Sequence, residues 1–303
     1  MSDALAARLW TYQAERFPLI QTVPLLAVFS ASSINVSAVL ADRALPGWPA
    51  YALGFLLAFA LFFLMRVCDE VKDAEDDRRY RPERPVPRGL VSLGLLIRLG
   101  IVSAAAAILA ALAWGIVQVL LLAGVLVWLA AMTAEFGVPA WLKARPVLYL
   151  LSHMAIMPLI DLMLTGVEWS GHGGPDGDLW VFLALSFVNG CVLEIGRKTW
   201  APLSERRGVD SYSRVWGPEN AAKIWLLTVA LSAALLIWLG LILDQLVWFA
   251  VPAAVGLAGC IWVGLRFIRE PQASAQKWLD HSAGLWVFLC YATAGFLPLL
   301  SGS

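Results

Sequence analysis

Three aspartates, each four residues from the next, stand in the most polar stretch of the sequence. Asp69, Asp73 and Asp77 belong to residues 68–77, which directly follow an apolar run. If one helix continues through all three, each carboxylate lies about 6 Å beyond the last, on nearly the same face. Like charges in this arrangement repel one another. A stripe of oxygen ligands therefore indicates a bound cation, and Mg²⁺ shared with phosphate oxygens is the usual case.

The stripe also has a simpler interpretation. Runs of charge at a membrane edge are often only solvated, and Lys72, Arg78 and Arg79 stand close enough in the sequence to neutralise the acids. The two interpretations differ in one respect, because a metal site needs further polar residues to converge on the same place.

A second mixed stretch of acids and bases, residues 194–212, follows another apolar run. Glu194 and Lys198 are one helical turn apart, Arg197 lies beside them, and Glu205 stands farther along. Carboxylates of this kind would hold Mg²⁺, whereas arginine and lysine would bind the outer oxygens of a diphosphate. Salt bridges within the stretch would explain the same residues, so that alternative stays open.

The composition places both stretches in a membrane protein. Mean hydropathy is +0.74, and only 15% of the 303 residues are charged. The formal net charge is zero, so no overall field favours nucleic acid as a partner. The four cysteines are scattered and lack metal-ligand spacing, so we expect them to be buried as small apolar side chains.

Nine apolar runs are long enough to cross a hydrocarbon core of about 30 Å. They are expected at 18–41, 51–68, 91–113, 115–133, 147–166, 179–196, 221–242, 246–267 and 283–301. Residues 1–17 form an amphipathic lead-in, with Arg8 and Arg16 available to lipid headgroups. We therefore expect an all-α membrane protein with one domain over residues 1–303, built as a bundle of about nine helices with a polar cavity on the cytoplasmic side.

The basic residues are distributed very unevenly over the connections. Of 22 lysines and arginines, all but Arg43 lie at the N-terminus or in 66–98, 143–145, 197–223 and 266–277. These segments share one end of the expected bundle, and positive charge favours the cytoplasmic side. We expect an integral protein of the inner or plasma membrane, with its N-terminus and active site cytoplasmic.

Two polar residues inside the expected spans could contribute to the cavity. Polar groups at this depth tend to face the interior of a bundle. His153, near the cytoplasmic end of its span, could orient or deprotonate an acceptor, and Asn189 could line the same cavity. A satisfied hydrogen bond between helices is the competing interpretation of each.

The two polar stretches together resemble the motifs of the UbiA-type intramembrane prenyltransferases. That family's first motif reads Asn-Asp-x-x-Asp-x-x-x-Asp, and Arg-Pro-x-x-x-Gly follows it. In the same register this chain has Asp69-Glu70-x-x-Asp73-x-x-x-Asp77, with Arg-Pro-Val-Pro-Arg-Gly at 84–89. Residues 136–145 are similar to the family's Tyr-to-Lys-Arg stretch, and 208–221 to the end of its second motif. The likeness covers nearly the whole chain.

The resemblance implies prenyl transfer from an isoprenoid diphosphate to a membrane-soluble or cytoplasmic acceptor, with Mg²⁺ as cofactor and the lipid bilayer as the setting. It also implies roles for the polar residues. The implied metal ligands are Asp69, Asp73, Asp77, Glu194 and Glu205; the implied catalytic residues are Asp73, Lys143 and Lys198; the implied substrate contacts are Arg84, Arg88, Arg145, Arg197, Asn189 and His153.

The second motif departs from the family pattern. The family has acids at three positions after an arginine, and in that register this chain has Lys198, Ala201 and Glu205. Lys198 could replace a metal ion as a fixed counter-cation, or the change could mark another substrate or a lost activity. A membrane terpene cyclase is one alternative. Another is a transporter or binding protein, although the repeats and broken helices common in transporters are not visible in the sequence.

Overall fold

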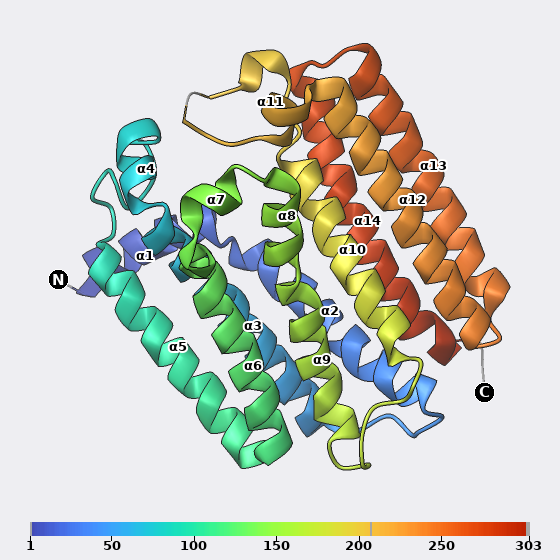
Figure 1. Cartoon of the computed structure of the whole chain (residues 1–303). Helices are drawn as coiled ribbons and strands as arrows, with labels where there is room; N and C mark the ends of the chain where they lie inside the picture. Colours follow the sequence, from blue (N-terminus) through green and yellow to red (C-terminus); the bar gives the residue numbers. More distant parts are fainter. Residues whose placement is uncertain (1, 207, 301–303) are drawn as a thin grey trace.

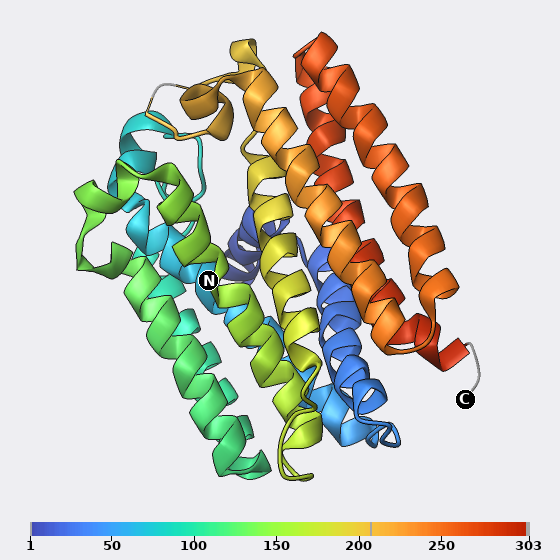
Figure 2. The same cartoon turned by 45° about the vertical axis from the view of Figure 1, so that its right-hand side comes forward.

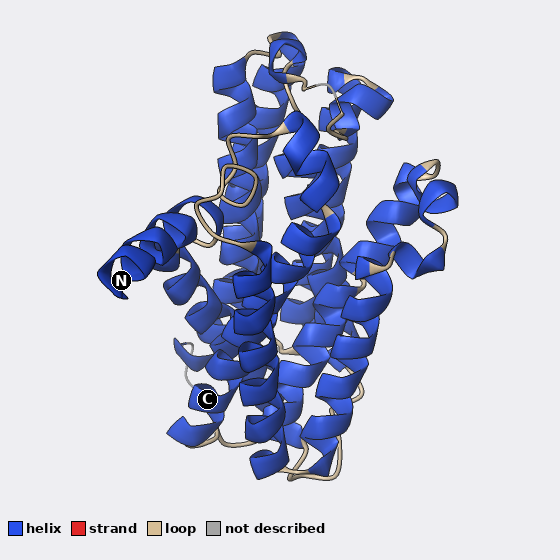
Figure 3. Cartoon of the chain, turned by 90° about the vertical axis from the view of Figure 1, so that its left-hand side faces the viewer, coloured by secondary structure: helices blue, strands red, loops and turns tan. Residues whose placement is uncertain are grey.

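The computed structural model describes residues 2–206 and 208–300, and within these ranges every regular element is a helix (Figure 3). Nine helical spans in this described part are long and apolar enough to cross a membrane. They are α2 Leu19–Leu40, α3 Trp48–Lys72, α5 Leu93–Trp114, α6 Ile116–Thr133, α8 with α9 Pro146–Trp169, α10 Leu179–Arg197, α12 Pro218–Ile242, α13 Leu246–Arg269 and α14 Ala273–Leu300. The expected all-helical membrane bundle is confirmed.

Short helices gather at one end of this bundle, where the connections rich in lysine and arginine lie (Figures 1 and 2). We call it the basic end. It carries α4 Ala74–Tyr80, α7 Pro139–Lys143 and α11 Tyr212–Trp216, together with the 3₁₀ turns η1 Glu135–Gly137 and η2 Pro202–Ser204. The polar stretches at 68–77 and 194–212 therefore lie at the same end of the molecule.

Local sequence signals explain where several helices begin. Proline stands in the first turn of α3, α8 and α12, where its missing N–H costs no hydrogen bond. The Ser92 hydroxyl accepts a hydrogen bond from the Leu95 N–H at the start of α5. Gly115, with φ +147°, joins α5 directly to α6. These signals fix the register of the helices that reach the basic end.

Two inner helices, α2 and α10, carry much of the apolar core. α2 contacts α3, α9 and α14, whereas α10 contacts α9, α12 and α14 (Figures 1 and 2). Their buried faces include Leu26 and Ile34 on α2 and Phe182 and Ile195 on α10. This packing holds the ends of α3, α8 and α10 around one region at the basic end.

The structure corrects the expectation of one straight helix through the three aspartates. α3 ends at Lys72, Asp73 adopts φ −88° and ψ 2°, and α4 begins at Ala74. The hydrogen bonds from the Asp73 N–H to the Asp69 carbonyl (2.9 Å) and from the Asp77 N–H to the Asp73 carbonyl (2.8 Å) cross the bend. The helical spacing of the three acids is thus kept. The bend directs the Asp77 side chain towards the connection that follows α4, where Arg81 and Arg84 bind it.

The fifth span also differs from the expected unbroken helix. It consists of α8 Pro146–Met154 and α9 Ile156–Trp169, which meet at Ala155. Pro158 has no N–H to bond the carbonyl of Met154, and a proline ring crowds the carbonyl four residues before it. The interruption therefore follows from the proline, and it places His153 at the end of α8.

The lead-in forms helix α1, Ser2–Arg16, and both of its arginines bind groups of the protein. Arg16 Nε lies 2.6 Å from Glu70 Oε1, and Arg8 donates to the carbonyl oxygens of Gly89 and Leu90. Arg16 is thus held by Glu70 of α3 and is less available to headgroups than expected, whereas Arg8 stays exposed while it donates to the connection after α3.

Candidate active site

A polar cavity of about 130 Å³ opens at the basic end, beside α8 and the connection that follows α10. Its lining combines two lysines, an aspartate and three hydroxyl groups with apolar neighbours: Lys143, Lys198, Asp210, Ser211, Tyr149, Tyr212, Pro146 and Val215. Two of the predicted catalytic residues, Lys143 and Lys198, therefore meet here from separate segments of the chain. The cavity expected at this end is present.

Lys72 connects the acid-bearing end of α3 to this cavity. Its Nζ donates a hydrogen bond to the hydroxyl of Tyr149, which lines the cavity, and lies 3.1 Å from Glu135 Oε1. Lys143 Nζ lies 3.6 Å from the same carboxylate oxygen. Because Glu135 is buried, the two lysines offset the cost of removing its charge from water. The cluster joins α3, η1, α7 and α8 at one point.

Glu135 was missed by the sequence reasoning, as were Lys72 and Tyr149. Glu135 and Phe136 have φ values of +47° and +55°, the left-handed region that non-glycine residues rarely adopt. Such conformations persist where the surroundings hold them and are common at functional sites. The signal that could have identified Glu135 is its position as the single acid between residues 134 and 145.

His153 lies next to this cluster. Its Nδ1 is 2.8 Å from the Tyr149 carbonyl oxygen, its ring stacks on the Tyr149 ring at 4.0 Å, and its Nε2 is 3.5 Å from Lys72 Nζ. A carbonyl oxygen can only accept, so Nδ1 carries the proton and Nε2 presents a lone pair towards Lys72. His153 thus supports Tyr149 and Lys72 from behind the cavity wall.

Asp69 and Asp73 offer carboxylates that fit one Mg²⁺ ion. Asp69 is half-exposed, with Arg66 at 3.4 Å, and Asp73 forms no direct ion pair with the residues that the structure describes. Burial, followed by the charges of Asp69 and Asp77, raises the pKa of Asp73. Mg²⁺ is commonly held by one or two carboxylates and completes its shell with water and phosphate oxygens. Within the described residues these two carboxylates have no third acid, histidine or cysteine grouped with them, so an ion here would take its remaining ligands from water or phosphate oxygens.

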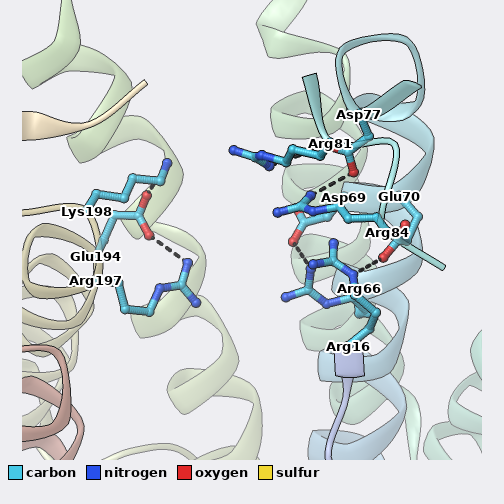
Figure 4. A network of polar contacts seen from close by, with 10 residues as sticks. All are labelled: Arg16, Arg66, Asp69, Glu70, Asp77, Arg81, Arg84, Glu194, Arg197 and Lys198. Atoms are coloured by element: carbon cyan, nitrogen blue, oxygen red, sulfur yellow. Dashed lines mark hydrogen bonds and ion pairs between the residues drawn. The ribbon is translucent and has the colours of Figure 1, made fainter. Parts of the chain in front are cut away.

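Asp77 has other partners. It is 3% exposed, and its carboxylate lies 2.7 Å from Arg84 Nη1 and 3.3 Å from Arg81 Nη1 (Figure 4). The two guanidinium groups compensate its charge, and each of its two carboxylate oxygens has an arginine partner. The geometry therefore gives no support to the expected metal role of Asp77, and it uses Arg84 as a structural partner.

The acids of the second stretch are also engaged. Glu194 lies 2.7 Å from Lys198 Nζ and 3.1 Å from Arg197 Nη2, within one helix end (Figure 4). Glu205 accepts hydrogen bonds from Ser211 and Ser213 and closes the loop before α11. Within residues 2–206 and 208–300, no three histidine, cysteine or acidic side chains group as a metal site. A second metal at these acids finds no support in the geometry.

Lys198 stays cationic in this setting. Burial, the largest influence, lowers its pKa, but the charge and hydrogen bond of Glu194 outweigh burial and raise the pKa overall. In Figure 4 the Glu194 group and the Asp69 group face each other, and Arg81 points from the α3 side towards Lys198. Both groups therefore combine carboxylates with basic side chains, on the α3 side and at the end of α10.

The two polar connections touch directly. Arg206 Nη1 lies 3.0 Å from Glu83 Oε1. Gly208 adopts φ +74°, and a Cβ placed there would lie 2.5 Å from the Tyr80 ring. The expected convergence of the two motif regions is thus visible where Glu83 meets Arg206 and Tyr80 lies against Gly208.

Gly208→Ala should destabilise the protein by about 1–3 kcal/mol, because a side chain at this φ is strained and also meets Tyr80. Thermal unfolding in detergent would measure the change. Gly177→Ala is the matched control, since nothing lies within 4 Å of its Cβ position. Equal melting temperatures for the two variants would show that the contact between the connections is not required.

The expected substrate contacts fall into two groups. Arg197 is half-exposed beside Lys198 and pairs with Glu194. Arg88 binds Glu15, Arg145 donates to the Trp141 carbonyl, and the Asn189 Oδ1 accepts from Ser232. The lining of the cavity contains none of these four residues. For Asn189, the competing interpretation of a hydrogen bond between helices matches what is seen.

The comparison with protein families decides the assignment. The profile of the UbiA prenyltransferase family matches residues 27–290. The chain belongs to the UbiA prenyltransferase family. This confirms the resemblance carried by residues 69–89 and 198–221. No curated protein matches the chain significantly.

Solved structures of UbiA homologues share the fold. A UbiA homologue from Aeropyrum pernix K1 gives a TM-score of 0.68 at 16% identity over 86% of this chain and 94% of its own. A digeranylgeranylglyceryl phosphate synthase gives 0.63 at 16% identity over 95% and 98%. A homologue from Archaeoglobus fulgidus, bound to DMAPP and Mg²⁺, gives 0.58 at 14% identity over 92% and 98%. The UbiA architecture therefore extends over nearly the whole chain.

Proposed function

We propose that this UbiA family member transfers a prenyl group from an isoprenoid diphosphate to an acceptor that is membrane-soluble or approaches from the cytoplasm. One observation carries the proposal. Lys72 joins the end of α3, with Asp69 and Asp73, to a cavity that Lys143 and Lys198 line. This link supports a site in which carboxylates at the end of α3 would hold a metal and amines at the cavity would bind phosphate oxygens, as a metal-bound diphosphate requires.

Asp69 and Asp73 are the residues that would hold Mg²⁺. When bound, the ion supplies positive charge that stabilises the departing diphosphate. The homologue from Archaeoglobus fulgidus was solved with DMAPP and Mg²⁺, which supports this pairing of donor and metal for the present chain. We assign no second metal, because Lys198 and Arg197 already neutralise Glu194.

Lys198 and Lys143 would act on the diphosphate directly. When the C–O bond of the donor breaks, its electron pair passes to the diphosphate oxygen and an allylic cation remains. Negative charge on the leaving oxygen grows as this bond breaks. Ammonium groups fixed at the diphosphate oxygens therefore stabilise the transition state more than the bound donor. Lys198, where the family has an acid, would therefore replace part of the metal charge.

The aromatic walls would protect the cation. Tyr149 and Tyr212 line the cavity, and Trp216 stacks on the Tyr212 ring at 4.7 Å. Excluding water lets the acceptor lone pair form the new bond to carbon, after which the acceptor loses its proton. Aromatic faces also stabilise a nearby cation.

A product assay tests the proposal. Protein in lipid nanodiscs is incubated with geranyl, farnesyl or geranylgeranyl diphosphate, Mg²⁺ and a membrane lipid extract, and products are identified by mass. We expect a prenylated acceptor and free diphosphate in equal amounts. A cyclised hydrocarbon would indicate a terpene cyclase, and binding with every donor recovered intact would indicate a protein without catalysis.

We further propose that the basic end faces the cytoplasm. Asp178→Cys, in the connection at the opposite end, should react with a membrane-impermeant maleimide on intact cells. Glu75→Cys, in α4, should react only after permeabilisation. Both positions are exposed, so the difference reports sidedness. The reverse labelling pattern would contradict this orientation.

A further inference from the structure

Helix α1 packs against the end of α3, where the first motif begins, and against the connection before α5. Tyr12 is 3% exposed and packs in a small apolar cluster with Val67, Val91 and Leu96, separate from the main core. The cluster joins α1, the end of α3 and the start of α5. An amphipathic helix that served only the lipid surface would not need this buried tyrosine.

Polar contacts surround that cluster on both sides. Arg8 donates to the carbonyl oxygens of Gly89 and Leu90, and Glu15 lies 2.7 Å from Arg88. Arg88 also donates to the carbonyl of Glu83. The Arg-Pro-x-x-x-Gly segment at 84–89 is thus fixed between α1 and Asp77, which Arg84 binds at 2.7 Å.

Glu70, the second residue of the motif, is turned away from its neighbour Asp69. It is 2% exposed, and its Oε1 lies 2.6 Å from Arg16 Nε. In Figure 4 Asp69 points to the side on which Glu194 lies, whereas Glu70 points to Arg16. Adjacent residues on a helix differ by about 100° in direction, and here the two carboxylates point to different sides of α3.

We propose that Arg16 and Glu70 are positioning residues. Through this ion pair α1 binds the end of α3 and so orients Asp69 and Asp73 towards the cavity. Glu70 occupies a motif position that suggests a metal ligand, yet its role is to anchor α1. The claim that the orientation of Asp69 and Asp73 serves metal binding rests on the proposed function. The claim that Glu70 anchors α1 does not depend on it.

A double-mutant cycle tests the inference in the full chain. Arg16→Gln, Glu70→Gln and the double variant are compared with Lys223→Gln, which breaks an exposed pair with Glu219 on α12. The first readout is amide hydrogen exchange of residues 66–81, followed by mass spectrometry. The second is Mn²⁺ binding in the presence of inorganic diphosphate, followed by electron paramagnetic resonance.

We expect each single variant to speed exchange in 66–81 and to weaken Mn²⁺ binding by about tenfold, as the loss of residues that orient metal ligands typically does. The double variant, which leaves no isolated buried charge, should be no worse than the worse single variant, because the two residues act as one unit. Lys223→Gln should match the wild type in both readouts.

Three results would overturn the inference. If Glu70→Gln weakens Mn²⁺ binding while Arg16→Gln leaves or strengthens it, Glu70 is itself a ligand. If the two effects multiply in the double variant, the residues act separately. If exchange in 66–81 equals that of the control, α1 does not position the motif. The exchange readout needs no prenyl donor. If the wild type neither binds Mn²⁺ with diphosphate nor transfers prenyl groups, the proposed function is refuted, while the exchange result still tests the anchoring by α1.

Discussion

Asp73→Asn should lower Mg²⁺-dependent turnover of an isoprenoid diphosphate at least about 100-fold. The substitution keeps the volume of the side chain and removes one of two carboxylates that would hold the ion, at a loss of several kcal/mol of charge stabilisation. Initial rates of diphosphate release over a Mg²⁺ titration measure the effect. The apparent affinity for Mg²⁺ should fall together with the rate.

The same variant should fold normally. Burial and the charges of Asp69 and Asp77 raise the pKa of Asp73, so the folded state holds its proton more tightly than the unfolded chain does. That stabilisation is present at low pH and is lost as the pH rises through the raised pKa, so at neutral pH the ionised carboxylate opposes folding. The melting temperature of Asp73→Asn should therefore equal or slightly exceed that of the wild type.

Asp76→Asn is the matched control for this prediction. Asp76 is exposed on α4, in the same segment, and should tolerate the substitution with nearly full activity. Near-normal activity of Asp73→Asn would instead mean that its carboxylate only balances neighbouring bases at the membrane edge.

Lys198→Asp should lower turnover by about tenfold or more at the Mg²⁺ concentration that saturates the wild type, because a fixed ammonium at the diphosphate is lost. The change also frees Glu194, which Lys198 now neutralises at 2.7 Å. Two carboxylates one turn apart would then be available to a second ion. Part of the lost rate should return as Mg²⁺ is raised, and the dependence of rate on Mg²⁺ should become steeper.

Lys198→Met separates the two effects, since it removes the cation without adding a ligand. It should lose turnover without recovering at high Mg²⁺. Lys223→Asp, on α12 and outside the cavity lining, should remain near the wild-type rate. Full activity of Lys198→Asp at the wild-type Mg²⁺ concentration would show that Lys198 takes no part in binding the diphosphate.

The features that depend on local sequence could be predicted well. Each apolar run is long enough to span the membrane on its own, and proline or serine at helix starts sets the boundaries. The uneven distribution of basic residues placed both motif regions at one end, where they touch through Glu83 and Arg206. The four-residue spacing of the aspartates likewise survives the bend at Asp73.

Partners distant in the sequence could not be predicted in the same way. Glu70 pairs with Arg16, and Lys72 pairs with Glu135. The positions of Glu70 and Lys72 in the sequence do not indicate these distant partners. A buried acid looks the same in a sequence whether it holds a metal or an arginine. Asp77 illustrates this, since it keeps the family register yet lies between Arg81 and Arg84. The family pattern therefore identified the region better than the role of each residue in it.

The most direct test of the central claim measures diphosphate released from isotopically labelled geranylgeranyl diphosphate by purified protein in nanodiscs of mixed membrane lipids. We expect release that requires Mg²⁺, is matched by label in an acceptor, and falls at least about 100-fold in Asp73→Asn. Release at the same rate in wild type and Asp73→Asn, or no release by the wild type from donors of any chain length, would contradict the claim.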